Sequence, residues 1–367
     1  MMWENGCFRL TAASSGERVV GGFRQRREVR RLHQWRILGS IALGCVVLAA
    51  ASCQSLPAGH SAPEKAAQEH QAEGMPPLLP ATLTAGQRLR VVATTSIVGD
   101  VVQNVGGQAV SLRVLLPLGA DPHAFEPTPQ DAKAVADAHV IFASGAGLEV
   151  FLERLLQSAG EQVPVVPLSY GVDLLRSVAH AEAESEGHED GEYDPHTWFD
   201  PTNVLVWVQN VEQALLALDP DNAEIYQSSA LHYQSQVEDL DSWIRDQVAC
   251  VPQTDRKLVT DHMSFGYFAR RYGFEQVGAV IPGYSTLAQP SARDLARLQD
   301  TIRTHKVSAV FVGVAVNPTL ADRVAEDTGA QLVQLYTGSL SEDGGPADSY
   351  LKLMRYNVNA IIDALSR

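Results

Sequence analysis

Residues 219–251 read DPDNAEIYQSSALHYQSQVEDLDSWIRDQVACV, and apolar side chains recur in this stretch at steps of three or four positions. This spacing is typical of one amphipathic helix, which at 1.5 Å per residue would be about 45 Å long. Asp219 is suited to cap such a helix, Pro220 to its first position, and Pro252 to its end. The stretch therefore predicts a rigid spine helix between two halves of the chain.

Short, nearly continuous apolar runs lie on both sides of the predicted spine helix, and stretches with helical periodicity separate them. Buried strands that alternate with helices are typical of parallel sheets covered on both faces. The sequence therefore predicts an α/β fold of two lobes, each a mainly parallel sheet flanked by helices. The predicted strands are LRVVATT (89–95), SLRVLLP (111–117), HVIFASG (139–145) and VPVVPLS (163–169), then KLVTDH (257–262), EQVGAVI (275–281), VSAVFVG (307–313) and QLVQLYT (331–337).

The beginning of the chain has the composition of an export signal. Residues 1–36 hold eight Arg against three Glu, and residues 37–52 (ILGSIALGCVVLAAAS) carry no charge. This apolar run is shorter than the roughly 20 residues that span a bilayer. It ends in Ala50-Ala51-Ser52-Cys53, which resembles a bacterial lipobox and predicts lipidation of Cys53. A plain signal peptide or a membrane anchor with an incidental Cys is the alternative.

The next segment, residues 53–87, is rich in Pro, Ala, Gly, Ser and Glu and shows no sustained period, which predicts a disordered tether. The predicted domains are a signal peptide with lipobox at 1–52, the tether at 53–87, a first lobe at 88–218, the linking helix at 219–251 and a second lobe at 252–367. Exported protein with a lipid anchor would lie on the periplasmic or extracellular face of a membrane.

Composition excludes some classes of function. The chain of 367 residues is 45% hydrophobic and 19% charged, which is ordinary for a globular protein. Its net charge of −15 argues against a polyanionic partner such as nucleic acid.

Three of the eleven His follow an Asp or Asp-Pro at or near the end of a predicted strand. They are His123 in LGADPHAFEPTPQD, His196 in EYDPHTWFDPTN and His262 in LVTDHMSFGYFARRYG. In parallel α/β sheets, ligands collect outside the carboxyl ends of the strands, where such loops lie. Neutral imidazoles from two lobes would form a zinc-type site, although spacings of 73 and 66 residues are not a local metal-binding signature.

Several strings of the chain resemble the substrate-binding proteins of bacterial ABC importers for zinc and manganese, the ZnuA/TroA-like family. They are DPHAFEPTPQD, GLEVFLERLL, DPHTWFDPTN, HMSFGYFARRYG, QPSARDLARL and SYLKLMRYNVNAI, in this order between about Leu89 and Leu365. The resemblance implies two α/β lobes joined by a long helix, with a metal ion in the cleft between them. It also implies His123 and His196 as ligands from the first lobe, and His262 from the second.

The chain departs from the family pattern at the fourth ligand. The family usually has an Asp in a Tyr-x-Asp-Ser-Leu string near the chain end, but Gly338 holds that position here. A Glu often found after the preceding strand is replaced by Gly313. A water molecule, or a carboxylate from Glu342 or Asp343, would then complete the shell. Three neutral nitrogens favour Zn²⁺, whereas Mn²⁺, the alternative, prefers more oxygen ligands.

An acidic segment, HAEAESEGHEDGEYD (180–194), holds seven carboxylates and two His in fifteen residues, which predicts a mobile loop. It is similar to a shortened form of the His-rich acidic loop of zinc-specific family members. His180 and His188 would then gather metal at low affinity; a merely solvated loop is the alternative.

The function that the resemblance implies is capture of Zn²⁺ and its delivery to an ABC permease by a monomer that catalyses no reaction. A zinc hydrolase is the enzyme alternative, with Asp261 or Glu126 as general base, but the sequence holds no HExxH or GxSxG string. A role in surface adhesion is a third alternative, because some family members are described as attachment proteins.

Overall fold

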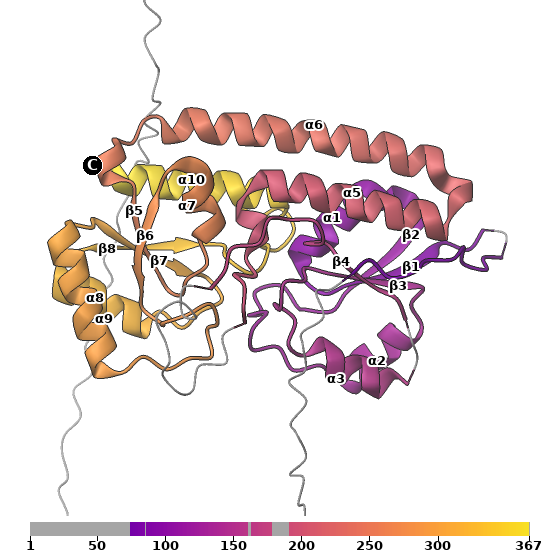
Figure 1. The fold of residues 1–367 in the computed structure, drawn as a ribbon, viewed down its shortest axis with the longest axis horizontal. Coiled ribbons are helices and arrows are strands. Elements are labelled where there is room, and N and C mark those ends of the chain that lie inside the picture. Colours follow the sequence, from indigo (N-terminus) through magenta and orange to yellow (C-terminus); the bar gives the residue numbers. More distant parts are fainter. Residues whose placement is uncertain (1–73, 85, 161–162, 178–190, 367) are drawn as a thin grey trace, which may run out of the picture. The chain divides into compact units, whose positions relative to one another are not determined.

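The computed structural model describes residues 74–84, 86–160, 163–177 and 191–366. Their strands form two four-stranded sheets, both entirely parallel, as Figure 1 shows. We call the sheet ordered β2-β1-β3-β4 and its helices the first lobe, and the sheet ordered β6-β5-β7-β8 and its helices the second lobe. This confirms the predicted fold class. The strands are β1 (Leu89–Ala93), β2 (Val110–Val114), β3 (Val140–Ala143), β4 (Val165–Pro167), β5 (Lys257–Thr260), β6 (Glu275–Ala279), β7 (Ala309–Gly313) and β8 (Gln331–Leu335).

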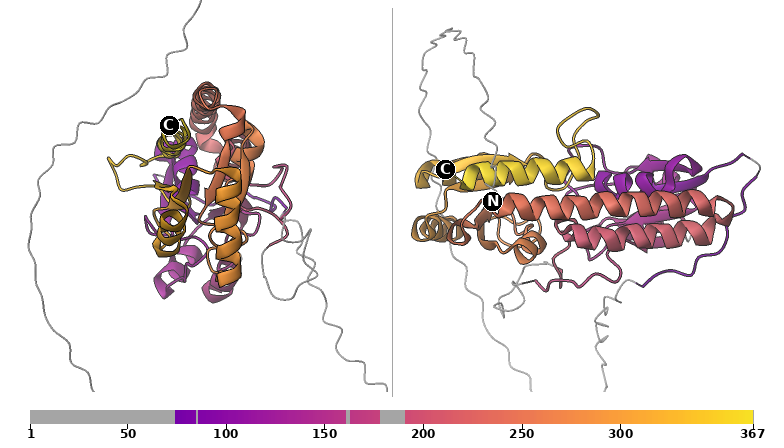
Figure 2. Two further views of the ribbon diagram at one scale, coloured as in Figure 1. Left: turned by 90° about the vertical axis from the view of Figure 1, so that its left-hand side faces the viewer. Right: turned by 90° about the horizontal axis from the view of Figure 1, so that it is seen from above.

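Helices cover both faces of each sheet. Figure 1 shows α2 and α3 below the first sheet, and α8 and α9 on the corresponding side of the second. The opposite side carries α1, α5, α6 and α10 (Figure 1), and α6 runs alongside α5 and α10 in the view from above in Figure 2. The helices are α1 (Ser96–Gly106), α2 (Pro129–Ala136), α3 (Leu152–Ala159), α5 (Pro201–Leu218), α6 (Ala223–Val248), α7 (Gly266–Tyr272), α8 (Ala292–His305), α9 (Thr319–Thr328) and α10 (Tyr350–Leu365).

The spine helix, α6, lies across both lobes and contacts α1, α5 and α10 (Figure 1). Its seven buried residues, from Tyr226 to Val248, follow the spacing seen in the sequence. Its start differs from the prediction, because residues 220–222 form a 3₁₀ turn and the helix begins at Ala223. Asp219 does not cap the helix; its carboxylate accepts hydrogen bonds from the Tyr226 hydroxyl (2.6 Å) and the Asn222 amide (2.8 Å).

One large apolar cluster joins the two lobes. It contains Leu89 and Val91 from β1, Phe311 from β7, and the buried faces of α1, α5, α6 and α10. The opposite face of each sheet has a smaller cluster of its own, which includes Val92 in the first lobe and Val310 in the second. Because the large cluster runs through both lobes, wide separation of the lobes on the spine side would expose core to water.

The last part of the predicted tether, residues 74–84, is ordered, so the predicted boundary at residue 87 is wrong. Met75, Leu78, Ala81 and Leu83 pack against the large cluster, and the Ala81 amide donates to the Leu218 carbonyl (2.8 Å). The Pro-rich composition of the segment led to the prediction of disorder. The apolar side chains at its end nevertheless pack against the core, and this orders the backbone there. The ordered part of the chain therefore starts before residue 88.

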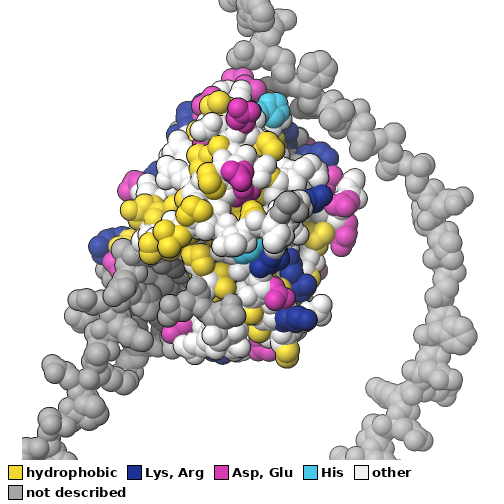
Figure 3. Space-filling model, turned by 90° about the vertical axis from the view of Figure 1, so that its right-hand side faces the viewer, with side chains coloured by type: hydrophobic (Ala, Val, Ile, Leu, Met, Phe, Trp, Pro, Cys, Tyr) yellow, Lys and Arg dark blue, Asp and Glu magenta, His cyan; other side chains and the backbone are white. Residues whose placement is uncertain are grey.

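None of the helices among the described residues combines the length and apolar composition that crossing a bilayer requires. The predicted signal segment and Cys53 lie outside the described residues, as do His180 and His188. On the face shown in Figure 3, acidic, basic and apolar side chains are interspersed.

Candidate metal centre

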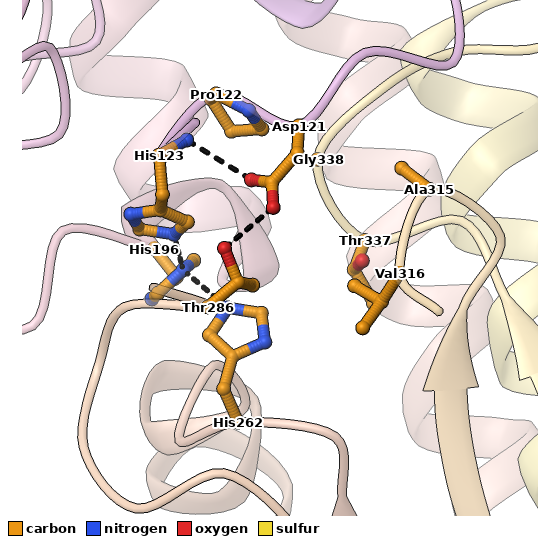
Figure 4. Close-up of a pocket in the computed structure, with 10 residues that line it drawn as sticks. All are labelled: Asp121, Pro122, His123, His196, His262, Thr286, Ala315, Val316, Thr337 and Gly338. Carbon is orange, nitrogen blue, oxygen red and sulfur yellow. Dashed lines mark hydrogen bonds between the residues drawn. The ribbon is translucent and has the colours of Figure 1, made fainter. Parts of the chain in front are cut away.

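The three predicted His residues lie together where the two lobes meet. His123 lies between β2 and α2, His196 precedes α5, and His262 follows β5 by two residues. The Nε2 atoms of His123 and His196 are 3.2 Å apart, and those of His196 and His262 are 3.0 Å apart (Figure 4). One ligand atom from each of the three residues lies within 4.8 Å of the others. The three imidazoles thus converge, although 73 residues separate His123 from His196 and 66 residues separate His196 from His262.

The Asp before each His explains how the chain fixes these rings. The backbone amide of His123 donates to Asp121 Oδ1 (3.0 Å), and that of His196 donates to Asp194 Oδ1 (2.9 Å). The amide of His262 donates in the same way to Asp261 Oδ1 (2.7 Å). A short side chain that binds a nearby backbone amide stabilises a tight turn. The Asp-Pro-His and Asp-His strings therefore build the turns that aim the three imidazoles.

Two of the Asp residues also set the orientation of the rings. His196 Nδ1 lies 2.9 Å from Asp194 Oδ1, and His262 Nδ1 lies 2.8 Å from Asp261 Oδ1. A hydrogen bond from Nδ1–H to a carboxylate leaves the lone pair of Nε2 directed at the cluster, as in metal sites whose ligating His is held by an outer carboxylate. The sequence showed these Asp residues beside the His but did not assign this role to them.

Burial favours neutral rings at the centre. His196 is 2% exposed and His262 is 3% exposed, while His123 is partly exposed. Burial lowers the pKa of His123 and of His196 well below the usual value, and the neighbouring imidazoles lower it further. Burial is also the largest single influence on the pKa of His262 and acts in the same direction, but the charge and hydrogen bond of Asp261, together with the charges of Asp121 and Asp194, outweigh it and raise that pKa. A neutral imidazole is the form that binds a metal ion.

Among the residues that the structure describes, one carboxylate lines the pocket around the cluster. Its lining residues are Asp121, Pro122, His123, His196, His262, Thr286, Ala315, Val316, Thr337 and Gly338 (Figure 4). The structure does not bring Glu342 and Asp343 there, since both are exposed and neither lines the pocket. They lie in a turn closed by its own bonds, in which the Gly345 amide donates to the Glu342 carbonyl (2.9 Å).

The two Gly positions leave no room for a larger residue in this arrangement. A Cβ atom at Gly313 would lie 2.2 Å from Thr337 Oγ1 and 2.9 Å from Asp261 Oδ2, and one at Gly338 would lie 2.8 Å from Pro122 Cδ. The Gly313 amide also donates to Asp261 Oδ2 (2.6 Å). At these two positions the neighbouring side chains of Thr337, Asp261 and Pro122 fill the space that a larger side chain would need. At Gly313 the backbone amide also holds Asp261 in place.

Comparison with known proteins agrees with this architecture. The chain matches the family model described as zinc-uptake complex component A, periplasmic (ZnuA), over residues 91–364. It is 34% identical over 283 residues to the manganese-binding lipoprotein MntA of Halalkalibacterium halodurans, which covers 77% of this chain and 90% of that protein. It is 31% identical over 291 residues to the manganese ABC transporter substrate-binding lipoprotein PsaA of Streptococcus pneumoniae, covering 77% of this chain and 91% of that one.

Solved structures show the same fold. The periplasmic zinc-binding protein TroA of Treponema pallidum superposes with a TM-score of 0.68 at 26% identity, covering 77% of this chain and all of that one. A manganese-bound periplasmic metal-binding protein of Candidatus Liberibacter asiaticus superposes with a TM-score of 0.66, also at 26% identity, over 76% of this chain and all of that one. From the family match, together with the two-lobe fold, we conclude that this chain belongs to the ZnuA/TroA-like family of metal-binding substrate-binding proteins.

Proposed function

We propose that the protein captures a divalent transition-metal ion between its lobes, outside the cytoplasmic membrane, and delivers the ion to a cognate ABC permease. The observation that carries the proposal is the convergence of the Nε2 atoms of His123, His196 and His262. A tetrahedral ion with bonds of about 2.0–2.1 Å sets its nitrogen ligands about 3.3 Å apart. The separations of 3.0 and 3.2 Å in this structure are close to that value.

Titration calorimetry on the chelator-stripped protein tests the proposal. One ion bound per chain, with release of heat or protons on binding, is the expected result, because three imidazoles at one point form one site. Binding of several ions with similar low affinity would instead indicate adsorption to exposed acidic groups, and the proposed function would fail.

Zinc is the proposed ion. Three imidazoles and a single carboxylate line the pocket among the described residues, and this nitrogen-rich set suits Zn²⁺ better than Mn²⁺. The names of MntA and PsaA support manganese as the alternative, while the name of TroA supports zinc. Because relatives with either metal in their names share the fold, the fold does not distinguish the two metals. We base the proposal of zinc on the ligand residues of this chain.

The arrangement favours binding over catalysis. A hydrolase needs a general base free to accept a proton from a metal-bound water. Both oxygens of Asp261 already accept hydrogen bonds, from His262 and from the Gly313 amide, and Glu126 is exposed outside the pocket lining. The two candidate bases from the sequence are therefore poorly placed for the role.

We also propose that residues 1–52 direct export and that Cys53 is lipidated. The relatives MntA and PsaA are named lipoproteins, which supports an anchor of this kind. We retain the proposed domain bounds, except that ordered structure includes residues 74–84. If the anchor is correct, a Cys53→Ser protein will be recovered from the soluble fraction of cells rather than from their membranes.

Replacing the carboxylate behind one proposed ligand is expected to weaken binding without removing a ligand. Asp261→Asn keeps the shape of the side chain but loses the charge that orients His262 through Nδ1. Loss of an outer partner of this kind typically weakens metal affinity by about 10- to 100-fold. Competition with a chromophoric chelator measures the change, and Asp246→Asn, on the exposed side of α6, is the matched control. Equal affinities of the two variants would contradict the role of Asp261.

A further inference from the structure

Asp121 has contacts in both lobes. Its Oδ1 accepts the backbone amide of His123, within its own loop (3.0 Å). Its Oδ2 accepts the hydroxyl of Thr286, which belongs to the segment between β6 and α8 of the second lobe (2.5 Å). Figure 4 shows the carboxylate between these two donors at the edge of the His cluster. One side chain thus ties the loop of the first His to the opposite lobe.

The Thr286 segment is in turn tied to the loop of His262. The Ile281 amide donates to the Asp261 carbonyl (2.7 Å), and the Met263 amide donates to the Gly283 carbonyl (2.8 Å). Movement of Thr286 is therefore coupled to the backbone on either side of His262. The hydrogen bond between Asp121 and Thr286 therefore connects the loop of His123 to the segment that is bonded to the loop of His262. This bond involves neither imidazole ring.

The back of the junction is held by other contacts. Ser339 accepts the Gly119 amide through its hydroxyl (2.8 Å), Ser96 accepts the Leu340 amide (2.9 Å), and Trp198 Nε1 donates to the Thr337 carbonyl (3.1 Å). The apolar cluster shared by α1, α5, α6 and α10 adds to this side. Since these contacts resist separation of the lobes, an ion is expected to enter and leave by local movement of the loops around the pocket.

His123 marks the side on which that movement would occur. It is the most exposed of the three imidazoles, whereas His196 and His262 are almost fully buried and held at Nδ1 by carboxylates. Asp121 supports the backbone of His123 in the same loop. The bond between Asp121 and Thr286 therefore crosses the pocket at its least buried ligand.

We propose that the hydrogen bond from Thr286 Oγ1 to Asp121 Oδ2 is a cross-lobe latch that sets the rate of metal release. With the latch made, the His123 loop is held against the second lobe and the ion is retained. When it breaks, His123 withdraws first and the ion is left with fewer ligands. Asp121 and Thr286 are positioning residues in this proposal, which rests on the proposed function.

The test is stopped-flow release of Zn²⁺ from the full chain into excess chelator. Thr286→Val keeps the size of the side chain but cannot donate to Asp121, so release is expected to be about tenfold faster, the effect of losing a hydrogen bond to a charged group. Thr286→Ser keeps the hydroxyl and should restore a rate close to that of the wild type. Thr254→Val is the control, because Thr254 also donates to a neighbouring carboxylate, Asp255, but on an exposed surface (3.0 Å).

A second measurement separates the latch from a general structural role. The melting temperature of the metal-free Thr286→Val protein should fall by no more than about 5 °C, because the roughly 1.4 kcal/mol that corresponds to a tenfold change is a small part of the unfolding free energy of a chain of this size. Asp121→Ala combined with Thr286→Val should release metal no faster than Asp121→Ala alone, because Asp121→Ala already removes the acceptor of the Thr286 hydroxyl. Additive effects, or an unchanged release rate in Thr286→Val, would overturn the latch. A wild-type chain that binds neither Zn²⁺ nor Mn²⁺ would instead refute the proposed function.

Discussion

His262→Ala is expected to weaken zinc binding more than any other single change described above. The loss should exceed the roughly 10- to 100-fold cost of removing an outer partner, because one of three proposed ligands disappears. His262 is 3% exposed, and its Nε2 lies 3.0 Å from that of His196. Its removal also leaves Asp261 buried without the imidazole that it holds. Titration calorimetry on chelator-stripped protein measures the affinity.

Thermal unfolding provides an independent readout of the same variant. An ion that binds only the folded state stabilises it by an amount that grows with the logarithm of the ratio of ion concentration to Kd. A 100-fold loss of affinity therefore removes about 2.7 kcal/mol of zinc-dependent stabilisation at saturating zinc. His232→Ala, on the exposed face of α6, is the control and should respond to zinc as the wild type does. If both variants bound zinc equally well, the three-imidazole site would be rejected.

Periodicity was sufficient to predict the architecture. The apolar runs around Val91 and Val310 are buried on both faces of their sheets, and this gives continuous rather than alternating hydrophobic patterns. The face of α6 from Tyr226 to Val248 carries the helical period for the same reason. The start of the helix was less predictable, because Asp219 binds the side chains of Tyr226 and Asn222 instead of the helix amides.

The candidate site could be predicted only in part. Each Asp-His or Asp-Pro-His string is a local signal, since the Asp binds the amide of a His one or two residues later. No local signal showed that Glu342 lies away from the His cluster. The turn that contains Glu342 is closed by its own hydrogen bonds and faces solvent. The contact between Asp121 and Thr286 joins residues 165 positions apart, and no periodicity in the sequence indicates it.

Zn²⁺ is expected to bind on the order of 1000-fold more tightly than Mn²⁺, because imidazole nitrogens follow the Irving–Williams order, in which Mn²⁺ is weakest. Co²⁺ should fall between them for the same reason. Competition titrations with all three ions, at one pH and in one buffer, give the order directly.

The contrary order would be equally informative about the ligands. Tighter binding of Mn²⁺ would agree with the names of MntA and PsaA and would require oxygen ligands that the three imidazoles do not supply. Within the described part of the chain, Asp121 is the one carboxylate that lines the pocket, so Asp121→Asn would then reduce Mn²⁺ affinity far more than Zn²⁺ affinity. With zinc preferred in the wild type, the same variant should change the affinities of both ions by a similar factor, because Asp121 would act through the His123 loop and not on the ion. The ratio of the two affinities in this variant therefore decides whether nitrogen or oxygen ligands dominate the site.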